Sequence, residues 1–334
     1  MSSNFFFSLG ALKPQKKNGA GSITCVTSKE VPGLVNISFA NLRLNKRGTL
    51  EPIWHPNANK IGYSIAGNVL VSIRTPSGVE TFTVKEGEIF FIPQGYIHNI
   101  ENIGETESVI NFALDSTTPE TMYLSKAVYS ISESVFNSTF NTSSQFIEGL
   151  KKSKNEELLK TLPQLQKNPK EIQSKYKFDI ADSNKAVLTK GGYVQLGTKT
   201  NLPVLKGLGI LGFGLNPKGI VEPHWHTNAG ELVYIVKGTT RITVLSPDGH
   251  VDVMEVKAGE GAFAPASYFH NIENIGSDNV EVIAFFSNAD PDYIGIGEVI
   301  GSYSNEVLAS VFNTAPNYFV DFKKPNKPLV IVPV

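Results

Sequence analysis

The C-terminal half of the sequence contains four side chains whose types and spacing suit a metal ion. His224 and His226 stand two residues apart on a predicted strand, so both imidazoles would point to one face. Glu231 opens the next predicted strand, and His270 follows a third, residues 259–265. Imidazole and carboxylate suit divalent first-row metals and leave coordination positions open for water, substrate or dioxygen. An isolated His-x-His pair is more often structural, but four such residues on three strands predict a metal site.

The sequence contains one long pattern twice. Residues 44–55 align with residues 215–226, and residues 98–104 are identical to residues 270–276. So many matches in the same order indicate the tandem duplication of one domain. We therefore predict a first domain at residues 20–150 and a second domain at residues 191–325, joined by a linker at residues 151–190. Residues 1–19 would be an N-terminal extension and residues 326–334 a C-terminal tail.

Within each repeat, strand-forming runs lead into tight turns. Residues 69–74 and 240–245 are rich in Val, Ile, Leu and Thr, and the turns that follow them, at 75–78 and 246–249, contain Pro and Gly. Short strands at this spacing favour an all-β sandwich or barrel. We predict two such barrels in tandem.

Three further segments are predicted to contain helices. Residues 121–135 and 293–311 would form small helices on the outside of each barrel. Residues 154–185 contain many Lys and Glu residues and are interrupted by Pro163 and Pro169. We therefore predict a surface linker there, with one or two short helices.

The C-terminal repeat resembles the two conserved motifs of the cupin superfamily. The positions that carry the resemblance are Gly219, His224, His226, Glu231 and Gly238, and then Gly259, Pro265, His270 and Asn274. Ser267 departs from the pattern, because the second motif usually has glycine there. The duplicated layout is most similar to bicupins of the microbial oxalate decarboxylase and germin-like type. The resemblance implies a jelly-roll, double-stranded β-barrel for each repeat. In the C-terminal barrel, it implies that the three histidines and Glu231 hold one divalent transition metal. That metal is often manganese, with Fe, Ni, Cu, Co or Zn as alternatives.

The first repeat has lost two of the four ligand types. At the aligned positions it carries Ile53, His55, Lys60 and His98. An aliphatic side chain cannot bind a metal, and a protonated lysine would repel a divalent cation. We therefore expect no tightly bound metal in this repeat. His55 and His98 would then be core histidines left over from the duplication or, alternatively, part of a ligand pocket without metal.

The reaction is less constrained by the sequence than the metal. Oxalate-decarboxylating relatives have an arginine three residues before the first motif histidine, where this chain has Val221. They also use a glutamate on a lid loop or strand, where this chain has Ala284. Without the arginine a dicarboxylate would lack a bidentate anchor, so we expect a substrate other than oxalate. Asp290 and Asp292 are the candidates for a general acid, although acidic loop residues are more often only solvated.

Apolar side chains are expected to line the site: Val221, Val233, Ile235, Phe263, Ala284 and Phe286. Such a pocket beside an open metal site favours an enzyme that oxygenates or decarboxylates a small organic molecule. A storage or ligand-binding cupin with a structural metal is the main alternative. An isomerase or sugar-modifying cupin is a third, although it would need polar groups that the pocket lacks.

Composition excludes several other classes of protein. The 334 residues include 30 Lys and Arg against 31 Asp and Glu, a net charge of −1, which gives no basic footprint for nucleic acid. The single cysteine, Cys25, excludes an intrachain disulfide. No apolar run is long enough to span a bilayer, and Lys13, Lys16 and Lys17 follow the first apolar patch, the wrong order for a secretory signal. We expect a soluble cytoplasmic protein with a small-molecule partner, and the resemblance is compatible with a homo-oligomer.

Overall fold

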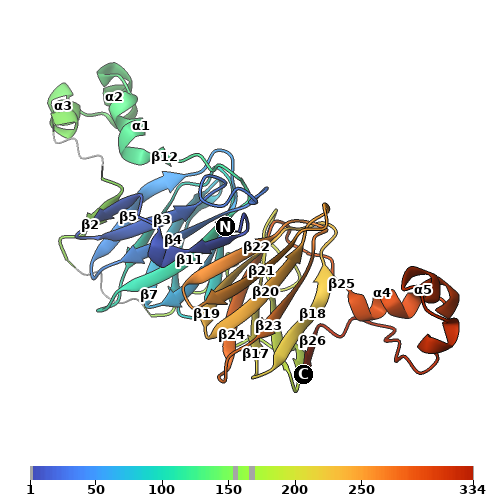
Figure 1. The fold of residues 1–334 in the computed structure, drawn as a ribbon. Coiled ribbons are helices and arrows are strands. Elements are labelled where there is room, and N and C mark those ends of the chain that lie inside the picture. Colours follow the sequence, from blue (N-terminus) through green and yellow to red (C-terminus); the bar gives the residue numbers. More distant parts are fainter. Residues whose placement is uncertain (1–2, 153–156, 165–169, 334) are drawn as a thin grey trace. The chain divides into compact units, whose positions relative to one another are not determined.

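The structure, a computed structural model, describes residues 3–152, 157–164 and 170–333. Contacts divide the chain into two compact units, each built around two β-sheets (Figure 1). The N-terminal unit consists of Lys13–Cys25 and Phe39–Lys177, and the C-terminal unit consists of Met1–Leu12, Val26–Ser38 and Phe178–Val334. Among the described residues, no helix has both the length and the apolar content that a bilayer crossing requires.

The N-terminal unit contains a seven-stranded and a six-stranded sheet. Their strand orders are β14-β9-β6-β11-β4-β3-β2 and β12-β5-β10-β7-β8, and β13 also pairs with β5. The strands are β2 (Lys16–Asn18), β3 (Gly21–Val26), β4 (Ser38–Leu44), β5 (Gly48–Trp54), β6 (Lys60–Ala66), β7 (Asn68–Thr75), β8 (Gly78–Lys85), β9 (Glu88–Ile92), β10 (His98–Asn102), β11 (Ser108–Leu114), β12 (Met122–Tyr123), β13 (Leu159–Thr161) and β14 (Lys177–Asp179).

The C-terminal unit repeats this arrangement. Its sheets have the orders β1-β22-β19-β24-β17-β16-β15 and β21-β20-β23-β18-β25, and β26 also pairs with β18. The strands are β1 (Phe6–Ser8), β15 (Lys185–Thr189), β16 (Gly192–Gly197), β17 (Gly209–Leu215), β18 (Gly219–Trp225), β19 (Glu231–Lys237), β20 (Thr239–Leu245), β21 (Val251–Lys257), β22 (Glu260–Ala264), β23 (Phe269–Asn274), β24 (Val280–Phe286), β25 (Ile294–Gly295) and β26 (Ile331–Pro333).

The identical stretches of the two repeats form the same local structure. The Asn102 side chain donates to three main-chain oxygens and accepts from Gly104 N–H. Asn274 makes the equivalent set of bonds in the C-terminal unit and accepts from Gly276 N–H. A buried amide with all of these bonds closes the turn after each strand. These asparagines therefore shape the barrel end rather than the chemistry.

Small helices lie outside the sheets, as the sequence predicts (Figure 1). The aligned helices that begin at Glu133 and at Asn305 are capped in the same way. Ser132 Oγ accepts from Val135 N–H, and Ser304 Oγ accepts from Val307 N–H. The helices are α1 (Leu124–Ser130), α2 (Glu133–Phe140), α3 (Ser144–Lys152), α4 (Ile296–Ser302) and α5 (Asn305–Val311), with 3-10 turns η1 (Leu9–Ala11) and η2 (Pro316–Phe319).

The linker differs from the expectation of one or two short helices. Within the described parts of residues 154–185, the regular elements are strands β13 and β14 and the beginning of β15. Lys177 explains part of this, because its buried ammonium group lies 2.9 Å from Glu88 Oε1 and fixes the segment to the sheet. Residues 153–156 and 165–169 of the predicted linker lie outside the described residues.

The two chain ends contribute strands to the C-terminal unit. β1 pairs with β22 through Phe6 opposite Ala262, and β26 pairs with β18 through Ile331 opposite Val221. The repeat boundaries alone place residues 1–19 before the first domain as an extension. The first strand of the chain, β1, instead belongs to the C-terminal unit, because a strand can pair with an open sheet edge that is distant in the sequence.

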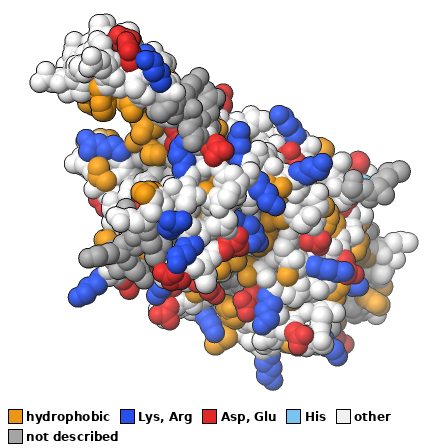
Figure 2. All heavy atoms as spheres, turned by 90° about the vertical axis from the view of Figure 1, so that its left-hand side faces the viewer, with side chains coloured by type: hydrophobic (Ala, Val, Ile, Leu, Met, Phe, Trp, Pro, Cys, Tyr) orange, Lys and Arg blue, Asp and Glu red, His pale blue; other side chains and the backbone are white. Residues whose placement is uncertain are grey.

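On the face drawn in Figure 2, Lys and Arg side chains are interspersed with Asp and Glu side chains. The formal net charge is −1, so neither sign dominates the chain as a whole. A nucleic-acid interface would require a continuous basic surface. The face in Figure 2 is instead a mixed, solvated surface, in keeping with the composition.

Candidate metal centre

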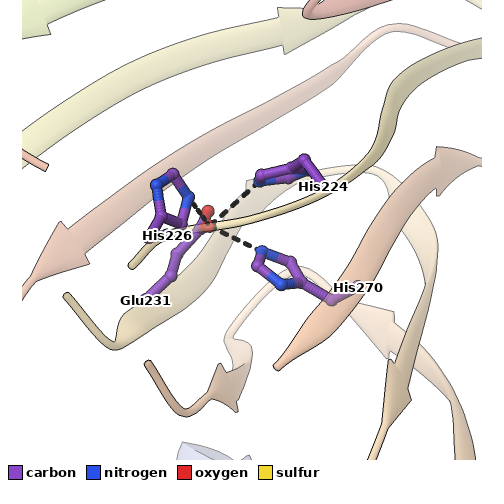
Figure 3. A group of neighbouring side chains, drawn as sticks. All are labelled: His224, His226, Glu231 and His270. Atoms are coloured by element: carbon purple, nitrogen blue, oxygen red, sulfur yellow. Dashed lines mark hydrogen bonds and ion pairs between the residues drawn. The ribbon is translucent and has the colours of Figure 1, made fainter. Parts of the chain in front are cut away.

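The four side chains predicted as ligands come together at one end of the C-terminal unit. β18 and β23 pair so that His224 lies directly opposite His270. The ladder slips between Val221 and His224, and His226 follows immediately after the end of β18. Glu231 is the first residue of β19, in the other sheet. The structure thus gathers four residues from three strands (Figure 3).

The three imidazoles converge on one carboxylate oxygen. Glu231 Oε2 lies 2.9 Å from Nε2 of His270, 3.0 Å from Nε2 of His226 and 3.6 Å from Nε2 of His224. One potential ligand atom from each residue lies within 4.8 Å of the others. Each of the four residues is at most 4% exposed. The group is therefore compact and buried.

Main-chain carbonyl groups orient all three imidazoles from behind. Nδ1–H of His224 donates to the main-chain oxygen of Glu222 at 2.7 Å, and Nδ1–H of His270 donates to that of Tyr268 at 2.8 Å. Nδ1–H of His226 donates to the main-chain oxygen of Asp292. These bonds select the tautomer in which Nε2 carries a lone pair. Three lone pairs then face a carboxylate oxygen with no proton between them. A cation among the four atoms would accept these lone pairs, and the donor set fits a divalent transition metal.

Burial sets the protonation of this group. It lowers the pKa of His224 to about 4; the neighbouring His270 lowers this pKa as well, and Glu231 raises it. Burial alone would raise the pKa of Glu231, but its contacts with the three imidazoles outweigh this effect and hold that pKa well below the usual range. At neutral pH, His224 is therefore neutral and Glu231 ionised. This is the protonation state that a metal ion needs.

Comparisons with known proteins identify the family of the chain. A cupin family model matches residues 8–148 and, separately, residues 178–318. The chain is a bicupin. Oxalate decarboxylase OxdC of Bacillus subtilis (strain 168) is 25% identical to it over 295 residues, which cover 86% of this chain and 76% of the relative. Germin-like protein subfamily 2 member 2 of Arabidopsis thaliana is 28% identical over 158 residues, which cover 45% of this chain and 72% of the relative.

A solved structure shows the same fold. Bacillus subtilis oxalate decarboxylase, studied for its Mn(II) centres, superposes on this bicupin with a TM-score of 0.86. The match covers 100% of this chain and 90% of the other at 22% sequence identity. The prediction of two tandem cupin barrels with small peripheral helices is confirmed.

Apolar side chains cover the inner side of the bicupin's metal-ligand group. Directly paired residues leave an antiparallel sheet on the same side. Phe286 pairs with Glu231, and its ring centre lies 4.9 Å from that of His226. Ala284 pairs with Val233, two residues further along both strands and therefore on the same side. The register places two more of the predicted wall residues on this side, Val221 and Ile235.

Phe263, also expected in the wall, leaves the sheet on the opposite side. It pairs with Leu232, whereas its neighbour Ala264 pairs with Glu231. Its ring instead fills the space beside Gly230, where a Cβ atom would come within 2.7 Å of it. β22 is buried from Gly261 onward on both faces, so the sequence shows no alternation that could have assigned the side chain correctly.

The two aspartates suggested as general acids occupy the loop before β25. Asp290 and Asp292 are both exposed. The Asp292 carboxylate accepts a hydrogen bond from Thr227 Oγ1 at 2.7 Å, and its main-chain oxygen is the one that orients His226. Asp290 contributes its main-chain oxygen to Asn228. The structure thus gives both residues a part in holding the loop, and neither carboxylate belongs to the group around Glu231.

Tyr293 is a site residue that the sequence did not reveal. Its ring stacks on His224, with centres 4.5 Å apart and planes 18° from parallel. Its hydroxyl group is buried close to Glu222 without a well-formed hydrogen bond among the described residues. Burial raises the pKa of this phenol, and the carboxylates of Glu222 and Glu231 raise it further, so it stays protonated. No motif marks Tyr293, but it directly follows Asp292 and precedes β25, which pairs with the ligand strand.

The aligned residues of the N-terminal barrel occupy equivalent strand positions but carry different chemical groups. Ile53 lies opposite His98, as His224 lies opposite His270 in the C-terminal unit. Lys60 begins β6 at the place that Glu231 has in β19, and its Nζ atom lies 3.4 Å from Nε2 of His98. The N-terminal group thus contains a cationic side chain where the C-terminal group contains a carboxylate.

Proposed function

We propose that His224, His226, Glu231 and His270 hold one divalent metal. Manganese is favoured over Fe, Ni, Cu, Co and Zn. We further propose that the bicupin is an enzyme that oxygenates or decarboxylates a small organic molecule. The observation that carries the proposal is the convergence of three Nε2 atoms, each with Nδ1 bonded to a main-chain oxygen, on one buried carboxylate. The Mn(II) centres of Bacillus subtilis oxalate decarboxylase support the choice of metal.

The residues around the group favour a substrate other than oxalate. Val221 and Ala284 face the ligand side, at the places where oxalate-decarboxylating relatives have an arginine and a glutamate. Among the described residues of the C-terminal unit, no Lys or Arg side chain is buried. A dianion would then have only the metal to balance its charge. We infer a substrate with an apolar body and one or two oxygen ligands, of the enediol or flavonol kind.

The chain's own groups can position such a substrate. A bound metal would supply Lewis acidity and open coordination positions. The ring of Phe286 and the apolar wall exclude water from one side of the group. The phenol of Tyr293 lies beside Glu222 and stays protonated, so it could donate a hydrogen bond to a substrate oxygen in place of Glu222.

One observation favours the alternative of a non-catalytic, ligand-binding cupin. The two exposed aspartates face solvent and the loop, and the described walls offer no carboxylate besides Glu231 and Glu222. Glu222 is engaged by the N–H groups of Leu329 and Val330. A reaction that needs a mobile proton donor would therefore depend on Tyr293 or on the substrate itself.

Metal analysis followed by turnover assays separates the two functions. The full chain is produced with added manganese or iron and its metal content is measured. Oxygen uptake and CO₂ release are then followed with oxalate, an enediol and a flavonol. We expect about one metal per chain and turnover of a non-oxalate substrate. A metal-loaded protein without turnover would support the ligand-binding alternative, and decarboxylation of oxalate would refute the inferred substrate class. A protein that binds no metal would refute the whole proposal.

A further inference from the structure

The N-terminal barrel keeps the main-chain carbonyl groups that orient the histidines, although two of the four ligand types have changed. Nδ1–H of His55 donates to the main-chain oxygen of Glu120 at 2.8 Å, and Nδ1–H of His98 donates to that of Tyr96 at 3.1 Å. The C-terminal barrel orients His226 and His270 from the same places. Both histidines of the N-terminal group therefore turn an Nε2 lone pair toward the barrel interior.

Lys60 is a buried amine without a carboxylate partner among the described residues. The residue is 5% exposed, and the structure shows no ion pair for it within the described residues. Its Nζ atom donates to Nε2 of His98 at 3.4 Å and lies 4.1 Å from the centre of the Phe112 ring. One long hydrogen bond and one aromatic face satisfy little of an ammonium group's bonding capacity. The group is therefore either neutral or completed by an anion.

His55 leaves a second unsatisfied atom beside it. The residue is 7% exposed, and Nε2 is buried with no hydrogen-bond partner among the described residues. Because Nδ1 carries the proton, Nε2 can only accept a hydrogen bond. Burial of the ring and, second, the proximity of Lys60 lower the pKa of His55 to about 3, so this nitrogen does not take up a proton near neutral pH.

We propose that His55, Lys60 and His98 form a binding site for a small carboxylate that also carries a hydroxyl group, a 2-hydroxy acid such as glycolate. The carboxylate accepts from the ammonium group of Lys60, which His98 positions. The hydroxyl group donates to Nε2 of His55. Each unsatisfied atom on the protein thus meets its complement, whereas a metal cation would meet the ammonium group. This goes beyond the proposed function, because it concerns the N-terminal barrel, in which we expect no tightly bound metal.

The site should distinguish ligands by their hydroxyl group. Acetate can bind Lys60 but leaves Nε2 of His55 unsatisfied, so we expect glycolate to bind at least tenfold more tightly, on the order of one hydrogen bond. Binding should also take up a proton, because an anion favours the charged amine. Burial lowers the pKa of Lys60 to about 7, although the nearby Cys25 raises it, so the affinity should fall roughly tenfold per pH unit above that value.

Calorimetric titration with glycolate and with acetate tests the proposal. The titrations use the full chain with His226→Ala, so that the C-terminal group cannot bind the probe through a metal. Lys60→Met should abolish binding of both acids. His55→Phe should remove the preference for glycolate, and His55→Gln, which keeps an acceptor near Nε2, should restore part of it.

Three results would overturn the proposal: no binding of glycolate at pH 6, equal affinities for glycolate and acetate, or unchanged binding in the Lys60→Met variant. If that variant fails to fold, the pH dependence of the parent decides the question. An affinity that does not change between pH 6 and 9 would exclude Lys60 as the anion partner.

Discussion

In the C-terminal barrel three imidazoles surround a carboxylate, and in the N-terminal barrel two imidazoles lie beside an ammonium group. The surrounding frame is nevertheless shared. Glu51 and Glu222 occupy aligned positions, and each accepts from a main-chain N–H at the start of the following helix, that of Ser125 and that of Gly297. The two barrels thus differ at two of the four positions, where Ile53 replaces a histidine and Lys60 replaces a glutamate. Main-chain geometry is not what separates the barrels.

The largest expected effect follows from removing one ligand. We expect His226→Ala to reduce the metal content from about one per chain to nearly zero, because a buried group with three ligands binds a divalent ion far more weakly. His55→Ala is the matched control in the other barrel and should leave the metal content unchanged. Equal loss from both variants, measured by mass spectrometry of the metal, would show that the barrels are not different in this respect.

Restoring the lost ligands should have the opposite effect. The double variant Ile53→His, Lys60→Glu recreates the four ligand types at positions whose register matches that of the C-terminal barrel. We expect the metal content to rise to about two per chain. Each single substitution is the control and should add much less, because it leaves three ligands or an unbalanced charge. If the double variant folds and still binds one metal, the frame of the N-terminal barrel is not equivalent.

Lys60→Met should stabilise the protein in a pH-dependent way. The pKa of Lys60 is about 7 in the folded protein, against an ordinary value of 10.5, because the amine is buried. Between these values the unfolded chain binds the additional proton, so the stability of the parent rises with pH across this window. The gain from Lys60→Met should therefore be largest below pH 7, on the order of 4 kcal/mol, and vanish above pH 10.5.

Denaturant unfolding of both proteins at pH 6, 8 and 10, in buffer without small carboxylates, measures this gain. A difference that is constant with pH would mean that Lys60 keeps its proton in the folded protein. The linked prediction for glycolate binding would then fail with it.

The shared frame predicts equal effects in the two barrels. Asn102→Ala and Asn274→Ala each remove a buried amide that bonds three main-chain oxygens. We expect each to lower the free energy of unfolding of its own barrel by about 2–3 kcal/mol. Metal content should change in neither variant. A loss of metal from Asn274→Ala alone would tie this turn to the site rather than to the fold.

The smallest effect is expected in the linker. Glu157 is exposed and accepts one hydrogen bond from Asn18. Glu157→Ala should leave metal content unchanged and alter stability by less than about 0.5 kcal/mol. A clear loss of metal in this variant, measured beside His226→Ala, would contradict a site confined to the C-terminal barrel.

The repeat and the resemblance to the cupin motifs made the fold predictable. The candidate site was predictable as well, because His224, His226, Glu231 and His270 stand at the motif positions that such a barrel brings together. Side-chain direction was less predictable where a strand is buried on both faces. Phe263 is the example, since its neighbours in β22 give no alternation. The register with β19 decides its direction, and register is a long-range property.

Two other features could not be predicted, because they depend on contacts between residues that are far apart in the chain. Tyr293 lies in a short segment without a motif, and only the pairing of β25 with β18 brings it to His224. The strands β13 and β14 form because the linker fits onto open sheet edges, whereas its composition alone favours helices. In both cases the partner strand determines the conformation, and local propensity does not.

Anomalous X-ray diffraction at the manganese edge, from crystals grown with Mn(II), tests the central claim most directly. We predict a single strong peak for each chain, surrounded by Nε2 of His224, His226 and His270 and by the carboxylate of Glu231. A peak beside Lys60, or the absence of a peak from a fully loaded preparation, would contradict the account.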